Sequence, residues 1–277
     1  MWAVTILVSM QDRDIVGGDA QGSGGAGFTR SWRRVAACSP SLVAPGRYVA
    51  ELMELVLALG GPAMNLQYER FRAHPDGQRL LAERPDLVAV LGDRDALAAL
   101  PEGSFGRAYL AFTDRYRFDA KVFDSVHDLD AMGDRLGWDD DQRFVIARGL
   151  QMHDLWHTLT GYGPDWAGEG AVIAFTHGQV DLRGTAFLRR IFDRFPGGVD
   201  RRRWRRFLDQ AQVRGQIAGN LLVAPYEELL AVPLDQARDE LGIVASARIH
   251  PDGIPYTPFR YGLAKQMDDG YDVGTAA

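Results

Sequence analysis

The 277-residue chain is long enough for one large domain or two small ones, and its 46% hydrophobic and 25% charged residues are typical of a protein with a packed core. A net charge of -6 excludes a strong overall attraction to nucleic acid or to an anionic membrane. The single cysteine, Cys38, excludes an intrachain disulfide and a thiolate-rich metal site, which indicates a reducing compartment.

The first 44 residues are expected to form a flexible, disordered leader. The opening stretch MWAVTILVSM is apolar but has only ten residues, too few to span a bilayer, and no basic residue precedes it as in a signal peptide. The following stretch GGDAQGSGGAGF has the composition of a disordered segment. No later segment approaches the length of apolar sequence that a membrane span requires. The sequence therefore favours a cytoplasmic location.

From about residue 45 the apolar residues recur at spacings of three and four, which is typical of amphipathic helices. The first predicted helix ends at Gly60 and Gly61, and a second covers residues 62–82 with a break near Pro75. A short helix with Asp93 as its N-cap is expected over residues 93–100. Another is expected over residues 104–116.

The second half of the chain shows the same helical period between clear start and stop signals. The acidic run that begins at Asp139 predicts a helix to about residue 159, before Gly161, and Asp165 can cap the next helix to about residue 179. Further helices fit residues 182–195, 200–222 and 233–241. We therefore predict an all-α fold in which one domain of about eight to ten helices spans residues 45–245. The aromatic tail, residues 246–277, is expected to be irregular and to pack on this domain or to be partly disordered.

The stretch HDLWHTLTGYGPDWAGE, residues 153–169, has the spacing of a metal site. His153 and His157 are four residues apart and share one helix face, which continues an apolar stripe. Asp154 flanks this face as a ligand or as a partner of one, and Glu169 lies in the first turn of the following helix. Two neutral imidazoles and two carboxylates would offer four ligands, and the two negative charges would neutralise one divalent cation. The alternative is a pair of ordinary core histidines, which would cost desolvation without a metal.

The same stretch resembles the signature of the ubiquinone (coenzyme Q) biosynthesis protein 4 family: His-Asp, two residues, His, eleven residues, Glu. Flanking sequence is similar to family segments in three places that follow the family's order: GQRLLAERPDL, ALPEGSFGRAYLAF and PYEELLAVPLDQARDELGI. The resemblance covers residues 45–245. It implies that the metal ligands are His153, Asp154, His157 and Glu169.

The resemblance also implies a function. Members of this family are all-helical proteins that lie against a membrane and handle polyprenylated quinone precursors. The implied reaction is an oxidative decarboxylation, in which the ring loses its carboxylate and gains a hydroxyl at the same carbon. The implied cofactor is one divalent metal, zinc or iron, with manganese also compatible. Other quinone-biosynthesis enzymes are the expected protein partners, and a homodimer is compatible with the sequence.

Two rival interpretations remain open from the sequence. The first is a non-catalytic, metal-stabilised scaffold that binds polyprenyl lipids. The second is an HD-type phosphohydrolase, for which His127 and Asp181 would join the His-Asp dipeptide. That interpretation leaves His157 and Glu169 unexplained.

Two further features have a structural and a functional interpretation. Trp156, Tyr162 and Trp166 are core aromatics or the walls of a pocket for an aromatic ring. A basic run opens a predicted helix, where it is a solvated face, a partner of acidic side chains, or a contact with anionic lipid at the inner face of the membrane. Its members are Arg201, Arg202, Arg203, Trp204, Arg205 and Arg206. The remaining histidines, His74, His127, His177 and His250, are expected to be structural or exposed.

Overall fold

The computed structural model describes residues 45–116, 129–194, 196 and 199–250, and within them the protein is all-α, as predicted. Nine helices of at least seven residues lie in this part of the chain, and an isolated bridge pairs Ser104 with Pro233. The predicted leader, residues 1–44, and the tail from residue 251 lie outside the described residues. The predicted domain bounds at residues 45 and 245 stay a prediction.

The first helix is longer than the sequence predicts. Helix α3, Pro45–Ala73, runs through Gly60, Gly61 and Pro62, so the predicted end at the two glycines is wrong. A glycine in a helix costs about 1 kcal/mol and a proline about 3 kcal/mol. The contact of α3 with α12 (Arg183–Arg194) and α4 (Pro75–Glu83) offsets these costs. The predicted break at Pro75 is confirmed, because α4 begins there with His74 as its N-cap.

Helix α10, Asp140–Thr160, begins and ends where its sequence signals predict. The Asp139 side chain accepts from the Gln142 amide, and the Gln142 side chain accepts from the Asp139 amide, which forms a capping box. Gly161 ends the helix with a φ of 73°, a left-handed conformation that glycine adopts without strain. Asp165 then caps α11, Trp166–Val180, by accepting from the amides of Ala167 and Gly168. These two ends fix the connection that brings α11 back against α10.

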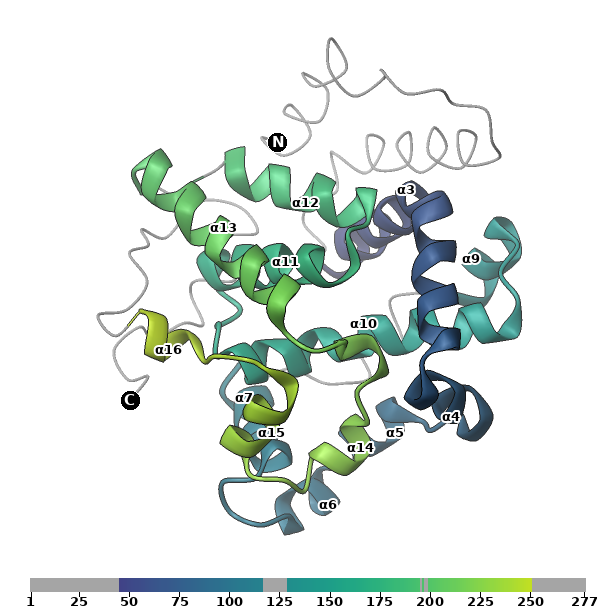
Figure 1. The fold of residues 1–277 in the computed structure, drawn as a ribbon, viewed down its shortest axis with the longest axis horizontal. Coiled ribbons are helices and arrows are strands. Elements are labelled where there is room, and N and C mark those ends of the chain that lie inside the picture. Colours follow the sequence, from purple (N-terminus) through teal and green to yellow (C-terminus); the bar gives the residue numbers. More distant parts are fainter. Residues whose placement is uncertain (1–44, 117–128, 195, 197–198, 251–277) are drawn as a thin grey trace.

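Helix α11 lies at the centre of the molecule, between α12 and α13 on one side and α10 on the other (Figure 1). It is buried on all sides along most of its length, as expected of a helix that is apolar all round. Its most extensive contact is with α13, Arg201–Ile217. Two glycines permit this close approach, because a Cβ on Gly215 would meet the Phe175 carbonyl and one on Gly178 would meet the Gln212 carbonyl.

The remaining helices are shorter and pack around this centre. The predicted helices over residues 93–100, 104–116 and 233–241 correspond to α6 (Arg94–Ala99), α7 (Phe105–Tyr116) and α15 (Leu234–Leu241). Helix α13 ends at Ile217, short of the predicted residue 222, and a 3-10 turn follows at Leu221–Val223. Four short helices were not predicted: α5 (Leu87–Gly92), α9 (Leu129–Leu136), α14 (Tyr226–Leu229) and α16 (Ser246–Ile249).

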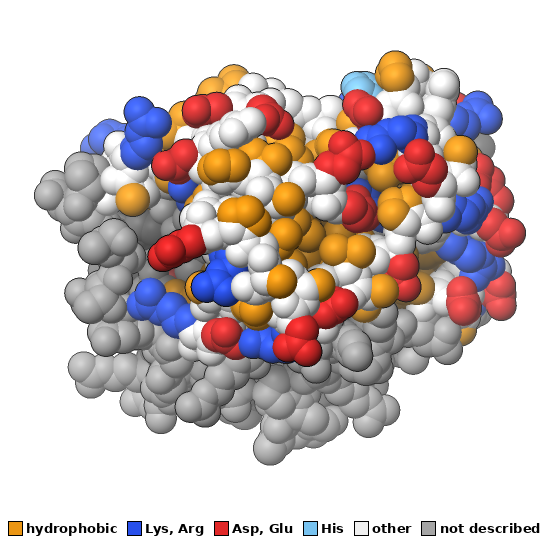
Figure 2. Space-filling model, turned by 90° about the horizontal axis from the view of Figure 1, so that it is seen from below, with side chains coloured by type: hydrophobic (Ala, Val, Ile, Leu, Met, Phe, Trp, Pro, Cys, Tyr) orange, Lys and Arg blue, Asp and Glu red, His pale blue; other side chains and the backbone are white. Residues whose placement is uncertain are grey.

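One large apolar core joins most of these helices, including α7, α10, α11, α12 and α13. On the face seen in Figure 2, hydrophobic side chains occupy a broad central area with acidic and basic side chains around it. Within the described residues, no helix combines the length and apolar character that crossing a bilayer requires.

Candidate metal centre

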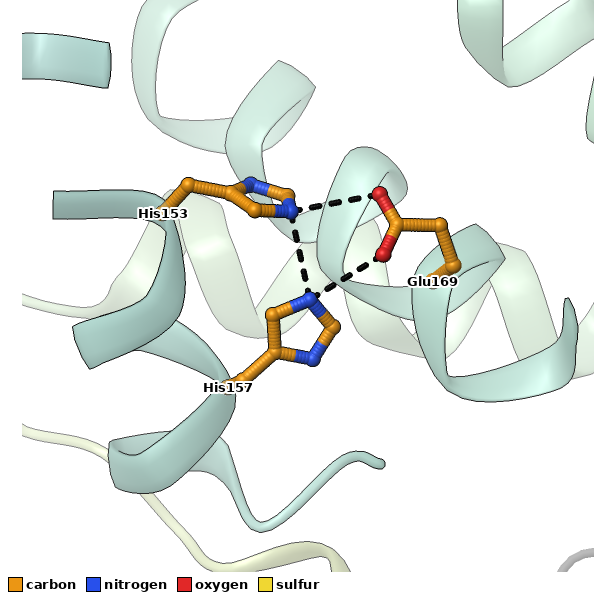
Figure 3. A group of neighbouring side chains, drawn as sticks. All are labelled: His153, His157 and Glu169. Carbon is orange, nitrogen blue, oxygen red and sulfur yellow. Dashed lines mark hydrogen bonds and ion pairs between the residues drawn. The ribbon is translucent and has the colours of Figure 1, made fainter. Parts of the chain in front are cut away.

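Three side chains from two helices converge at the start of α11 (Figure 3). His153 and His157 extend from one face of α10, and Glu169 extends from the first turn of α11 toward both rings. The Nε2 atoms of the histidines are 3.2 Å apart. The carboxylate of Glu169 places Oε1 3.2 Å from His153 Nε2 and Oε2 3.1 Å from His157 Nε2. The i, i+4 spacing and the Asp165 cap together produce this cluster.

The hydrogen bond at Nδ1 of His157 determines whether its Nε2 carries a proton or a lone pair. Nδ1 of His157 lies 3.0 Å from the carbonyl oxygen of Tyr162, and a carbonyl only accepts. Nδ1 therefore carries the proton, and Nε2 of the neutral ring is a lone pair directed at Glu169 and His153. A second hydrogen bond of this kind orients most histidines that bind metals.

Lone pairs that meet at such distances repel one another unless a proton or a cation lies between them. Zinc bonds of about 2.0 Å in a tetrahedral site separate neighbouring ligand atoms by about 3.3 Å, and octahedral bonds of about 2.1 Å separate them by about 3.0 Å. The separations of 3.1 and 3.2 Å fall between these values. The donor set thus fits one divalent metal, and two imidazoles with one carboxylate suit zinc, iron or manganese.

The charges of the cluster are strongly coupled. Burial would raise the pKa of Glu169, but the charge of the adjacent His153 and its hydrogen bond outweigh it and hold that pKa well below its usual range. Burial would lower the pKa of His153, but the Glu169 carboxylate more than compensates and raises it. Glu169 also lies in the first turn of α11, where the helix dipole favours a negative charge. The carboxylate is therefore ionised and available as a ligand at neutral pH.

One side of the cluster is closed and the other is open. The side chain of His157 is only 2% exposed, and the Phe112 ring from α7 stacks on its imidazole at a centroid distance of 5.7 Å. The side chains of His153 and Glu169 are each 22% exposed. The group is therefore partly exposed to solvent on the side of His153 and Glu169. Phe112 was not singled out from the sequence, because only the packing of α7 on α10 brings it to this site.

Asp154 does not join the three converging ligands. Among the described residues, the group whose ligand atoms all lie within 4.8 Å of one another is His153, His157 and Glu169. Asp154 is buried, and burial raises the pKa of its carboxyl, although both histidines oppose this rise. Its position one residue along α10 turns it away from the shared face. Its predicted role as a ligand stays a prediction.

The three aromatic residues near the ligands lie mainly in the core. The Trp156 indole N–H donates to the Tyr226 hydroxyl at 2.8 Å, and the ring packs edge-on against Phe175. Tyr162 is buried, with its carbonyl bound to His157. Trp166 is half-buried, and its ring lies 4.4 Å from that of Phe192. The predicted aromatic-lined pocket stays a prediction, and these contacts show that Trp156 and Trp166 also stabilise the core.

The basic run lies at the start of α13, as predicted, but its tryptophan does not face solvent. Trp204 is buried and donates its indole N–H to the Phe192 carbonyl at 2.8 Å, so the expected position at a membrane interface is wrong for this side chain. Arg205 pairs with Asp193 at 3.0 Å, which matches the acidic-partner alternative. Arg201, Arg202, Arg203 and Arg206 are exposed.

The other histidines that the structure describes lie outside the cluster. His177 is half-buried and its Nδ1 lies 3.0 Å from the Thr185 hydroxyl, which is a structural contact. His74 caps α4. Asp181 ends α11 and lies 3.8 Å from His177, away from the three ligands, and His127 lies outside the described residues. Of the two residues that an HD-type phosphohydrolase would add, Asp181 thus lies apart from the three converging side chains, and the position of His127 stays a prediction.

Comparison with known proteins shows which family the chain belongs to. The family model described as "Coenzyme Q (ubiquinone) biosynthesis protein Coq4" matches residues 29–246, which include His153, His157 and Glu169. The chain belongs to the Coq4 family. The protein of Bos taurus described as "Ubiquinone biosynthesis protein COQ4 homolog, mitochondrial" is 30% identical over 198 residues, which are 66% of this chain and 67% of that protein.

Fungal members are similar at slightly lower identity. The "Ubiquinone biosynthesis protein COQ4, mitochondrial" of Coprinopsis cinerea is 26% identical over 196 residues, or 69% of this chain and 64% of that protein. The match to the Pyrenophora tritici-repentis protein covers 63% of this chain and 58% of that one. The chain therefore spans less than two thirds of the length of these two relatives.

A solved structure shares the fold of this Coq4 family member. A candidate ubiquinone biosynthesis protein from Nostoc punctiforme superimposes with a TM-score of 0.55 over 79% of this chain and 97% of that one. At 18% identity this likeness concerns the arrangement of the helices alone.

Proposed function

We propose that this Coq4 family member is a metal-dependent enzyme of ubiquinone biosynthesis that acts on a polyprenylated hydroxybenzoate-type ring. The observation that supports it is the convergence of His153, His157 and Glu169 on one point, with one open side, in a chain of this family. The proposed reaction is oxidative decarboxylation at one ring carbon.

The three side chains would hold the metal, with Asp154 as a further candidate. A bound divalent metal would supply a Lewis acid that polarises oxygen atoms of the ring substituents, and iron would add redox chemistry. The Tyr162 carbonyl holds the His157 ring in one tautomer and orientation. Phe112 excludes water from the closed side of that ring.

The overall change defines what else the reaction requires. The carboxyl group leaves as CO₂ and a hydroxyl takes its place, so the ring loses two electrons. None of the three ligand side chains accepts electrons, and an external oxidant such as O₂ is therefore a co-substrate. The polyprenyl tail of the substrate and the exposed arginines of α13 favour a peripheral position at an anionic membrane surface. Other enzymes of the pathway are the proposed partners.

The first test is elemental analysis of protein purified without oxygen or chelator, together with Glu169→Ala and His157→Ala. About one equivalent of zinc, iron or manganese is expected in the wild type, and loss of the metal is expected in both variants because each removes one of few ligands. Circular dichroism checks that the helical fold persists. The control is His177→Ala, a histidine on α11 outside the cluster, which should keep its metal.

The second readout is turnover of a carboxylated, polyprenylated hydroxybenzoate by the metal-loaded protein with O₂. Release of CO₂ with formation of the hydroxylated ring supports the enzyme. Metal bound at full stoichiometry without turnover would contradict it and favour the lipid-binding scaffold. Wild-type metal content in Glu169→Ala and His157→Ala would disprove the ligand assignment.

A further inference from the structure

Arg214 is a half-buried residue whose buried guanidinium lacks a hydrogen-bond acceptor among the described residues. It lies in α13 on the side of Trp204, Phe207 and Ala211, the apolar face of that helix. All three guanidinium nitrogens are buried, and none has a hydrogen-bond partner among the described residues. Its contact is with the face of the Tyr162 ring, whose centroid lies 5.0 Å from Cζ. Burial lowers the pKa of Arg214 to about 10, so the group still carries its charge at neutral pH.

Two other polar atoms near this guanidinium are also buried without a hydrogen-bond partner in the part of the chain that the structure describes. The Tyr162 hydroxyl and His250 Nε2 are buried and have no hydrogen-bond partner within the described part of the chain. His250 lies close enough for the charge of Arg214, together with burial, to lower its pKa. Its ring packs on Phe207 at a centroid distance of 5.4 Å, and the Tyr162 ring meets Phe207 edge-on at 5.8 Å. Donors from three separate segments thus meet within one aromatic cluster.

Buried polar groups in native proteins are almost always hydrogen-bonded, and a buried charge without a partner costs several kcal/mol. A cluster of such groups therefore suggests a ligand that supplies the missing acceptors. Tyr162 also connects the cluster to the metal centre, because its carbonyl binds His157 while its ring contacts Arg214.

We infer that Arg214, Tyr162 and His250 form a binding site for the carboxylate of an aromatic acid. The planar guanidinium matches the two oxygens of a carboxylate, and the Tyr162 hydroxyl can donate a further hydrogen bond. With His250 neutral, the site carries one positive charge, which one carboxylate neutralises. A phosphate would add roughly one more negative charge to a buried site that has no cation to neutralise it. The Phe207 ring packs on the rings of both Tyr162 and His250, so a ligand bound to Arg214 would lie beside aromatic side chains, as an aromatic acid prefers.

This inference rests on the proposed function, since the ring substrate proposed there carries such a carboxylate. It assigns a second point of attachment for that substrate, formed by α13 and the loop after α10, in addition to the metal ligands.

The test compares wild type with Arg214→Gln by calorimetric titration and thermal unfolding, using the full metal-loaded protein. The probes are 4-hydroxybenzoate, its neutral amide and inorganic phosphate. Arg248→Gln, an exposed arginine on α16, is the matched control. We expect 4-hydroxybenzoate to bind to wild type and to the control, and its affinity to fall about 10- to 100-fold in Arg214→Gln, as for the loss of a charge-assisted hydrogen-bonded pair. The neutral amide should bind to wild type and to the control more weakly than 4-hydroxybenzoate does.

The stability of the unliganded protein separates a binding role from a structural one. Arg214→Gln removes a buried charge that lacks a counterion, so its unfolding temperature should equal or exceed that of wild type. Unchanged 4-hydroxybenzoate affinity in Arg214→Gln, or tighter binding of phosphate than of 4-hydroxybenzoate, would overturn the inference. Turnover with an unchanged KM in this variant would overturn it while leaving the proposed function intact. Arg214-dependent binding without turnover would instead retain the carboxylate site and reject the enzyme.

Discussion

At the scale of single residues, the chemistry of the site follows from which atoms carry protons. The Tyr162 carbonyl fixes the proton of His157 on Nδ1 and directs Nε2 at Glu169, 3.1 Å away. Burial alone would favour the neutral forms of His153 and Glu169, but the charge of each keeps the other in its charged form. The same contact that prepares the site for a metal therefore makes the metal-free site sensitive to pH.

The first prediction concerns the stability of the metal-free protein. Because the pKa of His153 is raised above 6.5, its contribution is complete below that pH and is lost as the pH rises through the raised value. Because the pKa of Glu169 is lowered from 4.5, its contribution is present above that pH and is lost as the pH falls through the lowered value. The contribution of the pair to the free energy of unfolding is thus greatest between pH 4.5 and 6.5.

Urea unfolding in the presence of a chelator, from pH 4.5 to about pH 9, measures this dependence. Glu169→Gln should remove the alkaline decline, since the neutral amide no longer raises the pKa of His153. An equal decline in that variant would show that other groups cause it. Saturating zinc should also remove the decline in wild type, because metal binding requires the deprotonated ligands.

At the scale of elements, the position of α11 decides the position of Glu169. This helix packs on α13 through glycines, and its first turn packs on the loop after α10 through Gly168, where a Cβ would meet the backbone of Gly163. The capping signals of α10 and α11 place their ends, while these close approaches determine how near the two helices come.

A pair of glycine substitutions tests this packing. Gly215→Ala should lower the free energy of unfolding by about 1–3 kcal/mol, because its Cβ would meet the Phe175 carbonyl and force α13 away from α11. Gly149→Ala is the matched control in α10, since no atom of the described residues outside its own helix backbone lies within 4 Å of its added Cβ. It should stabilise the protein by about 0.5–1 kcal/mol through the loss of unfolded-state entropy. Chemical denaturation of both variants gives the comparison, and equal effects would contradict the packing argument.

At the scale of the whole molecule, the charges are distributed unevenly despite the net charge of -6. The start of α13 presents Arg201, Arg202, Arg203 and Arg206 to solvent, while the acidic Asp193 and Asp209 pair with Arg205 and Arg189. A local basic surface of this kind can bind anionic lipid although the protein as a whole is acidic.

The corresponding prediction is binding of the full chain to vesicles that contain anionic phosphatidylserine. Replacement of Arg201, Arg202 and Arg203 by glutamate should weaken this binding at least about 100-fold, at about 1 kcal/mol for each basic residue lost near the surface. Salt should weaken wild-type binding as well. Glutamate at Arg70 and Arg72 on α3 and at Arg248 on α16 is the control for the same change in net charge. Equal binding of both variants would exclude α13 as the lipid contact.

The sequence by itself determined the helical class, most helix ends and three of the side chains that converge in the candidate metal centre. Each depends on local information: the 3.6-residue period, the side chains that cap α10 and α11, and the i, i+4 spacing of His153 and His157. The helix end predicted at Gly60 and Gly61 is wrong, because the tertiary contacts of α3 outweigh the low helix propensity of glycine. Asp154 follows the family motif but is not in the group of three whose ligand atoms converge, and its role as a ligand stays a prediction.

Only the tertiary structure brought together residues that are far apart in the chain. Phe112 reaches His157 through the packing of α7 on α10. Arg214 meets Tyr162 from another segment, and His250 packs on the neighbouring Phe207; the one local signal was a charged residue on the apolar face of α13. Burial removes the water molecules that would bond to such groups, so a neighbouring residue or a ligand must supply the hydrogen bonds. Residue spacing in the sequence does not show which groups are buried in this way.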